Sequence, residues 1–348
     1  MDMRETSTVR LTILHFFAGD NERSMPSGYD ALRTTAAWLD LSTRGRIYAT
    51  GEDRARLLHA MLTNHVQQLK PGEGCYAFFL NAQGHVQADV NLLCLEDRFL
   101  LDIEPETRER VFRHLDKYII ADDVALADVT EAVACLAVEG PHAAAMLAAI
   151  GAPAPEADFA HAAWTGAIVQ RASATGEPGF RIFLPAEEKA AWIARLDSAG
   201  ASPATADEAR TVRLEHGQPR YGEDIFDTTL PQETRQMHAV HFAKGCYLGQ
   251  EIVERIRSRG HVNRLLVGLE IEGDAPVPGG TRITSGDAEA GEITSSAFSP
   301  ALGKAVALGY VRAQFAAEGT PLQADGRAAM AAGDPLGRVP GTRLGPGN

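Results

Sequence analysis

Residues 244–251 read KGCYLGQE and place a cysteine among residues that turn the chain, carry charge and form hydrogen bonds. The run IVERIRSR follows, so we expect a helix that begins near Tyr247 and leaves Cys246 at its N-terminal end. The partial positive charge of a helix N-terminus favours a thiolate, and Lys244 adds to that effect. The positions considered together as this motif are Lys244, Gly245, Cys246, Tyr247, Gly249, Gln250 and Glu251.

A functional thiol is one of two alternatives for this segment. No partner base is visible beside Cys246, because His241 lies five residues upstream. Free cysteines are usually buried, so a reactive or contacting thiol and an inert, buried thiol both remain open. The missing base favours a thiol that makes contacts or takes part in transfer over a hydrolytic nucleophile.

The cysteines and histidines are too dispersed to predict a metal site. The chain has four cysteines without a C-x-x-C pair, and its histidines form no H-x-x-x-H or H-E-x-x-H pattern. We therefore expect no metal centre and no permanent iron–sulfur cluster. Few, widely spaced cysteines also fit a reducing cytosol better than a disulfide scaffold.

A second candidate group is the carboxylate of Asp89, which lies in NAQGHVQADV just after a predicted turn. Strand alternation from Val86 places Ala88 and Val90 on one face. Asp89 then lies on the other face with Gln87. A carboxylate in such a place is usually exposed to solvent, and a functional role requires a pocket there.

Composition limits the classes of partner. The chain has 348 residues, of which 45% are hydrophobic and 23% charged, as in a globular protein of two or three domains. Its net charge of −13 argues against direct nucleic-acid or membrane-surface binding, but allows a local basic pocket for a small anion. The apolar run at 11–17 is too short to span a bilayer. We expect a cytoplasmic protein with an N-terminal extension over 1–27.

The hydrophobic pattern predicts an α+β fold with antiparallel sheet, because strands and helices mix without a βαβ rhythm. A helix is expected over 51–69 and hairpins over 75–95 and 167–185. The segment TGEPG, at 175–179, predicts only the turn of the second hairpin. A further helix is expected over 207–217.

The texture of the sequence changes after Gly260. Short strands such as RLLVGLEIEG and KAVALGYV are separated by proline and glycine, which predicts a small β-barrel or sandwich. We expect this C-terminal domain over 261–335, after a folded region over 28–260. A disordered tail, rich in proline and glycine, is expected over 336–348.

Several segments together resemble the glycine cleavage T protein superfamily over roughly residues 28–330. TGEPGF resembles its TGEDGF, VRLEHGQPRYGEDI resembles its R-L-E and YG-x-D block, and GEITSSAFSPALGKAVALGYV resembles its barrel motif. The resemblance implies a three-domain ring around a central channel, with a split mixed α/β folate-binding region in two subdomains and a C-terminal β-barrel. It also implies binding of tetrahydrofolate or a one-carbon folate derivative.

Within that superfamily, KGCYLGQE resembles the K-G-C-[FY]-x-G-Q-E signature of YgfZ-type folate-binding proteins, with every fixed position present. Aminomethyltransferases have a different sequence and no cysteine there. The resemblance implies support of iron–sulfur cluster assembly or repair, and of tRNA modification by iron–sulfur enzymes. Iron–sulfur assembly or client proteins would be its partners, and Cys246 its functional thiol.

The resemblance also implies folate-binding residues. Asp89 falls on the aspartate that interacts with the reacting nitrogen of the folate, and Tyr76 on a folate-contacting tyrosine. Glu177 falls on the glutamate that holds the pterin ring, where a carboxylate can accept two N–H bonds. Arg213 falls on an arginine of the pocket block.

Three hypotheses follow. The first is a YgfZ-type folate-binding protein that uses Cys246. The rival is a tetrahydrofolate-dependent aminomethyltransferase or demethylase, in which Asp89 orients the amine and stabilises the developing cation. The third is an interaction scaffold with a vestigial pocket.

Overall fold

The computed structural model describes residues 27–260 and 262–332. Within these ranges, no helix is both long enough and apolar enough to cross a membrane. The expected N-terminal extension, apart from Ser27, and the expected tail over 336–348 lie outside the described residues. The first described helix is α1 (Gly28–Thr34), where the Ser27 side chain accepts a hydrogen bond from the backbone N–H of Asp30.

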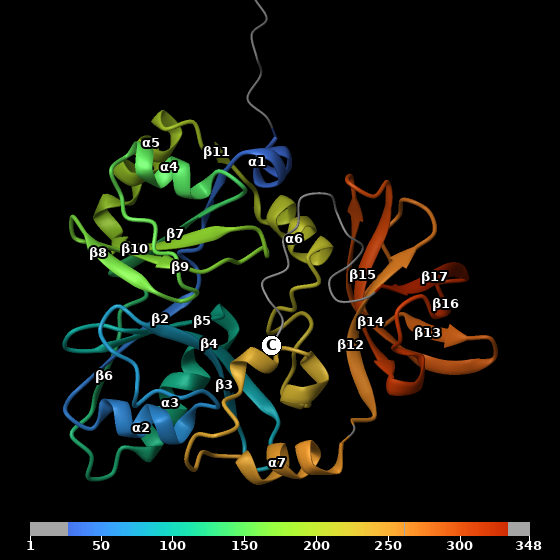
Figure 1. Ribbon diagram of the computed structural model, residues 1–348, viewed down its shortest axis with the longest axis horizontal. Coiled ribbons are helices and arrows are strands. Elements are labelled where there is room, and N and C mark those ends of the chain that lie inside the picture. Colours follow the sequence, from blue (N-terminus) through green and yellow to red (C-terminus); the bar gives the residue numbers. More distant parts are fainter. Residues whose placement is uncertain (1–26, 261, 333–348) are drawn as a thin grey trace, which may run out of the picture.

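Two sheets face each other in the larger part of the chain (Figure 1). The five-stranded sheet has the order β3 (Gly74–Leu80), β4 (Val86–Cys94), β5 (Phe99–Ile103), β2 (Gly45–Thr50) and β6 (Ala125–Asp128). The six-stranded sheet has the order β11 (Ser202–Pro203), β1 (Ala37–Asp40), β7 (Val133–Glu139), β10 (Gly179–Pro185), β9 (Ala167–Arg171) and β8 (His161–Trp164). Strand β11 pairs in parallel with β1, and the other neighbours are antiparallel.

Helices cover the outer face of each sheet (Figure 1). The five-stranded sheet is covered by α2 (Arg54–Met61) and by α3 (Arg108–Tyr118), which follows the 3-10 turn η1 (Pro105–Thr107). The six-stranded sheet is covered by α4 (Ala143–Ala149) and by α5 (Lys189–Ser198), which follows η2 (Ala186–Glu188). Burial of one leucine side chain in such a core stabilises the fold by about 1.5–3 kcal/mol. With both outer faces covered, the inner faces of the two sheets meet.

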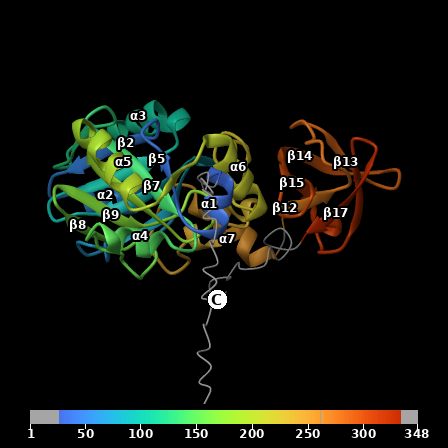
Figure 2. The same ribbon diagram turned by 90° about the horizontal axis from the view of Figure 1, so that it is seen from above.

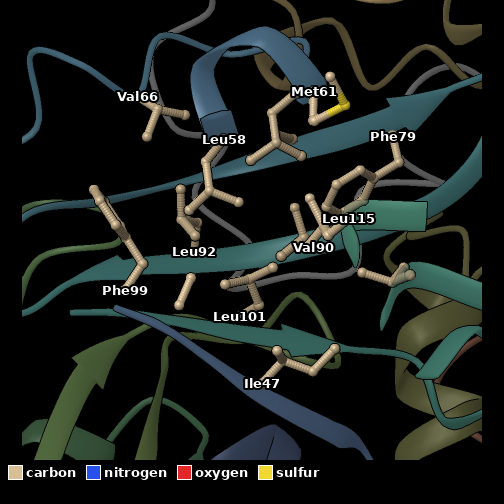
Figure 3. Packing of buried hydrophobic residues seen from close by; sticks show 14 of the residues in the cluster. Ile47, Leu58, Met61, Val66, Phe79, Val90, Leu92, Phe99, Leu101 and Leu115 are labelled. Carbon is tan, nitrogen blue, oxygen red and sulfur yellow. The ribbon is translucent and has the colours of Figure 1, made fainter. Parts of the chain in front are cut away.

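The helix predicted over 51–69 is wrong in its length, because α2 ends at Met61. Thr63 and Asn64 bind backbone carbonyls of other segments through their side chains, at 2.6 and 2.9 Å. Such side-chain bonds compete with continuation of a helix. Val66 still enters the apolar core beneath α2 (Figure 3), which explains why the apolar pattern extends beyond the helix.

A bulge in the β3–β4 hairpin changes which residues share a face. Phe78 pairs with Asp89, but the register shifts by one residue before Val86 is reached. Val86 therefore packs on the same side as Phe78, whereas Ala88 and Val90 pack in the outer core. The predicted alternation is correct for Ala88 and Val90 and wrong for Val86.

The chain between the sheets and its last domain forms short helices. The helix expected over 207–217 is α6 (Ala206–Glu215), closed at its N-terminus by reciprocal hydrogen bonds between Thr205 and Glu208. It is followed by η3 (Pro231–Thr234), η4 (Met237–Ala239) and α7 (Gln250–Arg259). Figures 1 and 2 show α6 and α7 between the two sheets and the C-terminal strands.

The C-terminal strands close into a six-stranded barrel, seen at one end of the molecule in Figure 2. Its order is β12 (Arg264–Ile271), β15 (Lys304–Arg312), β14 (Ala288–Ser299), β13 (Arg282–Ser285), β16 (Pro321–Ala324) and β17 (Arg327–Ala332), with the 3-10 turn η5 (Ala313–Phe315) after β15. Leu214 of α6 packs with Leu266 and Leu308 on the outside of this barrel. The predicted α+β fold with a C-terminal barrel is confirmed.

Candidate functional site

Asp89 lies on the inner face of the five-stranded sheet, between its contact with the six-stranded sheet and its contact with the segment that leads to the barrel. Asn91, two residues further along β4, exchanges amide hydrogen bonds with Gln170 of the six-stranded sheet at 2.6 and 3.0 Å. Phe78, the cross-strand partner of Asp89, packs instead with Tyr221 in the segment that leads to the barrel. Asp89 is therefore buried between these two contacts, with 6% of its surface exposed, and it does not face solvent.

The carboxylate of Asp89 has one oxygen with a partner and one without. Its Oδ2 accepts a 2.8 Å hydrogen bond from the hydroxyl of Tyr76. Its Oδ1 is buried, and no donor among the described residues reaches it. A buried acceptor without a partner costs about 1–3 kcal/mol. This oxygen is thus available to a ligand that brings an N–H group or a positive charge.

The environment of Asp89 also changes its acidity. Burial raises the pKa of Asp89 to about 6, and the negative charge of Glu104 adds to this rise. The positive charge of Arg44 and the hydrogen bond from Tyr76 act in the opposite direction. Burial, with Asp89 beside it, raises the pKa of Tyr76, so the Tyr76 hydroxyl keeps its proton and remains a donor. A carboxyl of this kind can hold or release a proton near neutral pH.

Buried arginine–carboxylate contacts next to Asp89 were not predicted from the sequence. Arg44 donates to Asp102 at 2.9 Å and also binds Glu104, and Arg220 binds Glu104 at 2.9 Å. Arg44 lies directly before β2 and Glu104 directly after β5, and both charges are visible in the sequence. Their contact depends on which strands pair, and no local pattern shows that pairing.

Glu177 forms a second buried site in the loop between β9 and β10. Its Oε1 accepts a hydrogen bond from Arg33 and lies 3.1 Å from Nε2 of His216. The loop approaches α6 closely: Gly176 has a φ of +96°, and a Cβ there would lie 2.5 Å from Cβ of His216. TGEPG is therefore more than a hairpin turn, because it holds a buried carboxylate against the end of α6.

Arg213 lies in the joint between α6 and the barrel. It is buried and binds Glu223 at 2.5 Å and Asp224 at 2.7 Å. Asp224 in turn accepts hydrogen bonds from Thr294 and Ser295 of the barrel, at 2.6 and 2.5 Å. Among the described residues, the hydrogen bonds of Arg213 do not include Tyr76, Asp89 or Glu177.

Most of the KGCYLGQE motif anchors a loop. Nζ of Lys244 donates to backbone carbonyls at the end of α2, those of His59 and Leu62, and burial lowers the pKa of Lys244 to about 8. The backbone N–H of Tyr247 donates to the side chain of Gln250 at 3.0 Å. Gly249 has a φ of +83° and passes so close to the β3–β4 turn that a Cβ would meet the carbonyl of Asn81 at 2.5 Å.

Cys246 and Glu251 are the outward-facing members of the motif. Helix α7 begins at Gln250, so Cys246 lies four residues before it, and the predicted position at a helix end is wrong. Cys246 is exposed, which excludes the alternative of a buried thiol, and Glu251 makes a surface ion pair with Arg255 at 3.0 Å. Gly245 passes His59, at a position where a Cβ would lie 3.8 Å from Nε2.

No group of three or more potential metal ligands converges within the described ranges. A hollow lined by Trp164 and Arg195 lies between α4, the β8–β9 turn and α5. It is on the outer side of the six-stranded sheet, whereas Asp89 faces the inner side.

Comparisons with known proteins give the family. Residues 15–244 match the GCVT N-terminal domain, and residues 264–336 match the glycine cleavage T-protein C-terminal barrel domain. The chain belongs to the glycine cleavage T-protein family.

Related T proteins match over most of their length. The aminomethyltransferase of Rubrobacter xylanophilus is 35% identical over 295 residues, which cover 81% of this chain and 78% of that protein. An aminomethyltransferase of Thermus thermophilus is 33% identical over 325 residues, 89% of each chain. The crystal structure of glycine cleavage system aminomethyltransferase T from Bartonella henselae superposes with a TM-score of 0.82 at 26% identity, covering 90% of this chain and 89% of that chain.

In this chain the predicted site residues fall in separate places. Tyr76 and Asp89 are in direct contact, whereas Glu177 and Arg213 bind other partners. The segment after α6 connects the Asp89 site with the Glu177 site. His216 of this segment contacts Glu177, and Arg220 contacts Glu104 beside Asp89.

Proposed function

We propose that this T-protein family chain binds tetrahydrofolate or a one-carbon folate derivative and transfers a one-carbon unit to or from it. The observation that carries the proposal is the buried Oδ1 of Asp89, which has no donor among the described residues. Buried acceptors are nearly always paired, so a ligand donor fits this position. The relatives support the same activity, because they are named aminomethyltransferases.

Each residue has a separate task in this proposal. The folate supplies the nitrogen atoms that carry the one-carbon unit. Asp89 orients the donor amine and stabilises the positive charge that develops there. Such electrostatic stabilisation is stronger in a buried site than in water. Tyr76 fixes the rotation of that carboxylate through its 2.8 Å hydrogen bond.

Glu177 is suited to the pterin end of the folate. The contacts from Arg33 and His216 both go to Oε1 and fix the carboxylate in the loop. A carboxylate held in this way can accept N–H bonds from an amino-pyrimidine edge. Arg213 supports the site indirectly, by holding the segment after α6 against the barrel.

The decisive experiment is turnover of a methylamine donor in the presence and absence of tetrahydrofolate. Wild-type protein should show folate-dependent turnover, and Asp89→Asn should reduce kcat by about 10²-fold or more, because it removes the charge and keeps the shape. Asp97→Asn is the matched control, since Asp97 is an exposed aspartate that pairs with Arg98. Absence of binding of any reduced folate in calorimetry would instead favour an interaction scaffold with a vestigial pocket.

A second candidate function is the YgfZ-type role in iron–sulfur cluster assembly or repair in the cytoplasm. It is favoured by the placement of Cys246, an exposed thiol in a loop whose neighbouring motif residues are anchored. Such a thiol can contact a partner protein, a sulfur species or a cluster without disturbing the fold. Cys246→Ser should abolish support of iron–sulfur enzyme activity in cells that lack the native protein, while folate binding persists. Full rescue by this variant would overturn the role of the thiol.

A further inference from the structure

Two buried carboxylates stand opposite each other on the inner face of the five-stranded sheet. Strands β4 and β5 pair Asn91 with Asp102, and continuing this antiparallel register by two residues places Asp89 opposite Glu104. Glu104 lies directly after β5 and keeps an extended backbone, with φ −65° and ψ 143°. Side chains that are opposite in neighbouring antiparallel strands have Cβ atoms about 4.5–5.5 Å apart. The pairing of β4 with β5 therefore makes the two carboxylates neighbours.

Arg44 lies next to Glu104 in the same row of side chains across the sheet. Strands β2 and β5 pair Gly45 with Ile103, so Arg44 falls opposite Glu104. Arg44 binds Oε1 of Glu104, and Arg220 from the segment after α6 binds Oε2 at 2.9 Å. With a guanidinium group on each oxygen, Glu104 presents a fixed negative charge to Asp89.

We propose that Glu104 is a positioning residue that controls the protonation of Asp89, and that Arg220 limits its effect. Like charges on opposite residues repel, so the ionised form of Asp89 is disfavoured by Glu104 and favoured by each arginine. Because Arg220 comes from the segment that also contacts Glu177, movement of that segment would change the charge balance at Asp89. The role of Glu104 in catalysis rests on the proposed one-carbon transfer, but its effect on the proton of Asp89 does not.

Other ionisable groups surround this carboxylate pair and contribute a constant background. They are Tyr76 on β3, Tyr221 in the segment after α6, Arg110 on α3, Asp102 on β5, Arg181 on β10, His238 on η4, which stacks on Tyr76, and Glu106 on η1, which Arg220 also binds at 2.7 Å. The substitutions below leave all of these groups in place.

The test is a carbon-13 NMR titration of the full chain without folate, labelled at the aspartate carboxyl carbons and assigned with Asp89→Asn. Glu104→Gln should lower the midpoint of the Asp89 titration by about one pH unit, and Arg220→Gln should raise it, because the two substitutions remove charges of opposite sign. Glu104→Asp should restore most of the wild-type midpoint. Glu109→Gln is the control, since Glu109 is exposed on α3 and pairs with Arg113.

Opposite shifts in the two variants are the expected result, and an unchanged Asp89 midpoint in folded Arg220→Gln and Glu104→Gln would overturn the proposal. If Glu104→Gln does not fold, Arg220→Gln decides, because the side chain of Arg220 is 30% exposed and its loss leaves Arg44 on Glu104.

Calorimetry of wild-type protein with tetrahydrofolate at several pH values tests the proposed function separately from the effect of Glu104 on Asp89. Failure to bind folate contradicts the proposed function while leaving the titration result intact. If folate binds, the pH dependence of its Kd should shift in Glu104→Gln in the same direction as the Asp89 midpoint.

Discussion

The hydroxyl of Tyr76 donates a 2.8 Å hydrogen bond to Oδ2 of Asp89 and leaves Oδ1 of the same carboxylate without a donor among the described residues. Tyr76 comes from β3 and Asp89 from β4, so the contact joins adjacent strands of one sheet. The tyrosine therefore fixes the carboxylate in an orientation that keeps one oxygen for a ligand. This relationship leads to two predictions that need no assumption about the donor substrate.

Tyr76→Phe should weaken folate binding without unfolding the protein. The substitution frees the Asp89 carboxylate to rotate, which should raise the Kd for folate by about tenfold. The hydrogen bond itself is already made in the free protein, so its free energy of about 1.5–3 kcal/mol is lost from folding and not from binding. The substitution should also raise the pKa of Asp89 above about 6, because the hydrogen bond from Tyr76 lowers that pKa. Calorimetry with tetrahydrofolate measures the first effect. Tyr48→Phe is the control, since Tyr48 lies on β2 with its ring under the guanidinium group of Arg98. An equal loss of affinity in this variant would contradict a specific role for Tyr76.

Asp89→Asn should make the protein more stable at neutral pH. The pKa of Asp89 is raised to about 6 in the folded state, from 3.8. The folded state therefore holds the proton more tightly than the unfolded state, and ionised Asp89 destabilises the fold by up to about 3 kcal/mol at pH 7. This cost disappears as pH falls through 6 to below 3.8. Urea unfolding of both proteins at pH 7 and pH 4 measures the difference, and a variant that is less stable at both values would contradict the assignment.

The elements that carry Asp89 could be predicted from the sequence more fully than its surroundings. The hairpin and the barrel follow from apolar alternation and from glycine and proline turns, which are local signals. The burial of Asp89 depends on its neighbours Phe78 and Asn91, which contact Tyr221 and Gln170 from segments far away in the sequence. The local pattern around Asp89 does not show these tertiary contacts. The bulge before Val86 shows the same limit, because one inserted residue reverses a face without any change in composition.

The resemblance implies folate-binding roles for Tyr76, Glu177 and Arg213 but does not give their partners in the fold. Arg213 binds acidic residues of its own joint because α6 and the barrel are packed together, and that packing has no signature near position 213. Cys246 illustrates a different failure. The run IVERIRSR that follows it predicts a helix start near Tyr247, but Gly249, with a φ of +83°, delays the helix to Gln250.

Gly176→Ala should destabilise the Glu177 site more than an alanine substitution at an open glycine. Both Gly176 and Gly166 have positive φ, at +96° and +81°, but a Cβ at 176 would lie 2.5 Å from Cβ of His216, whereas a Cβ at 166 meets nothing within 4 Å. Gly166→Ala should therefore lose about 1 kcal/mol from backbone strain alone. Gly176→Ala should lose clearly more and should also weaken folate binding, because the clash displaces Glu177. Urea unfolding and calorimetry of both variants check this, and equal losses would contradict the close contact with α6.

Cys246 should react with a thiol reagent in the folded protein while the other three cysteines do not. Cys75, Cys94 and Cys135 are buried, and burial raises the pKa of the Cys75 and Cys135 thiols to about 12, which suppresses their reactive thiolate. One equivalent of label is expected under native conditions and four after denaturation, as measured by mass spectrometry. Cys246→Ser should remove the native label completely, and Cys94→Ser should leave it. Loss of the anchor in Lys244→Met should speed the labelling of Cys246, because the loop would no longer be held at the carbonyl groups of α2. Unchanged labelling kinetics in that variant would show that the remaining contacts of the loop are enough to hold the thiol.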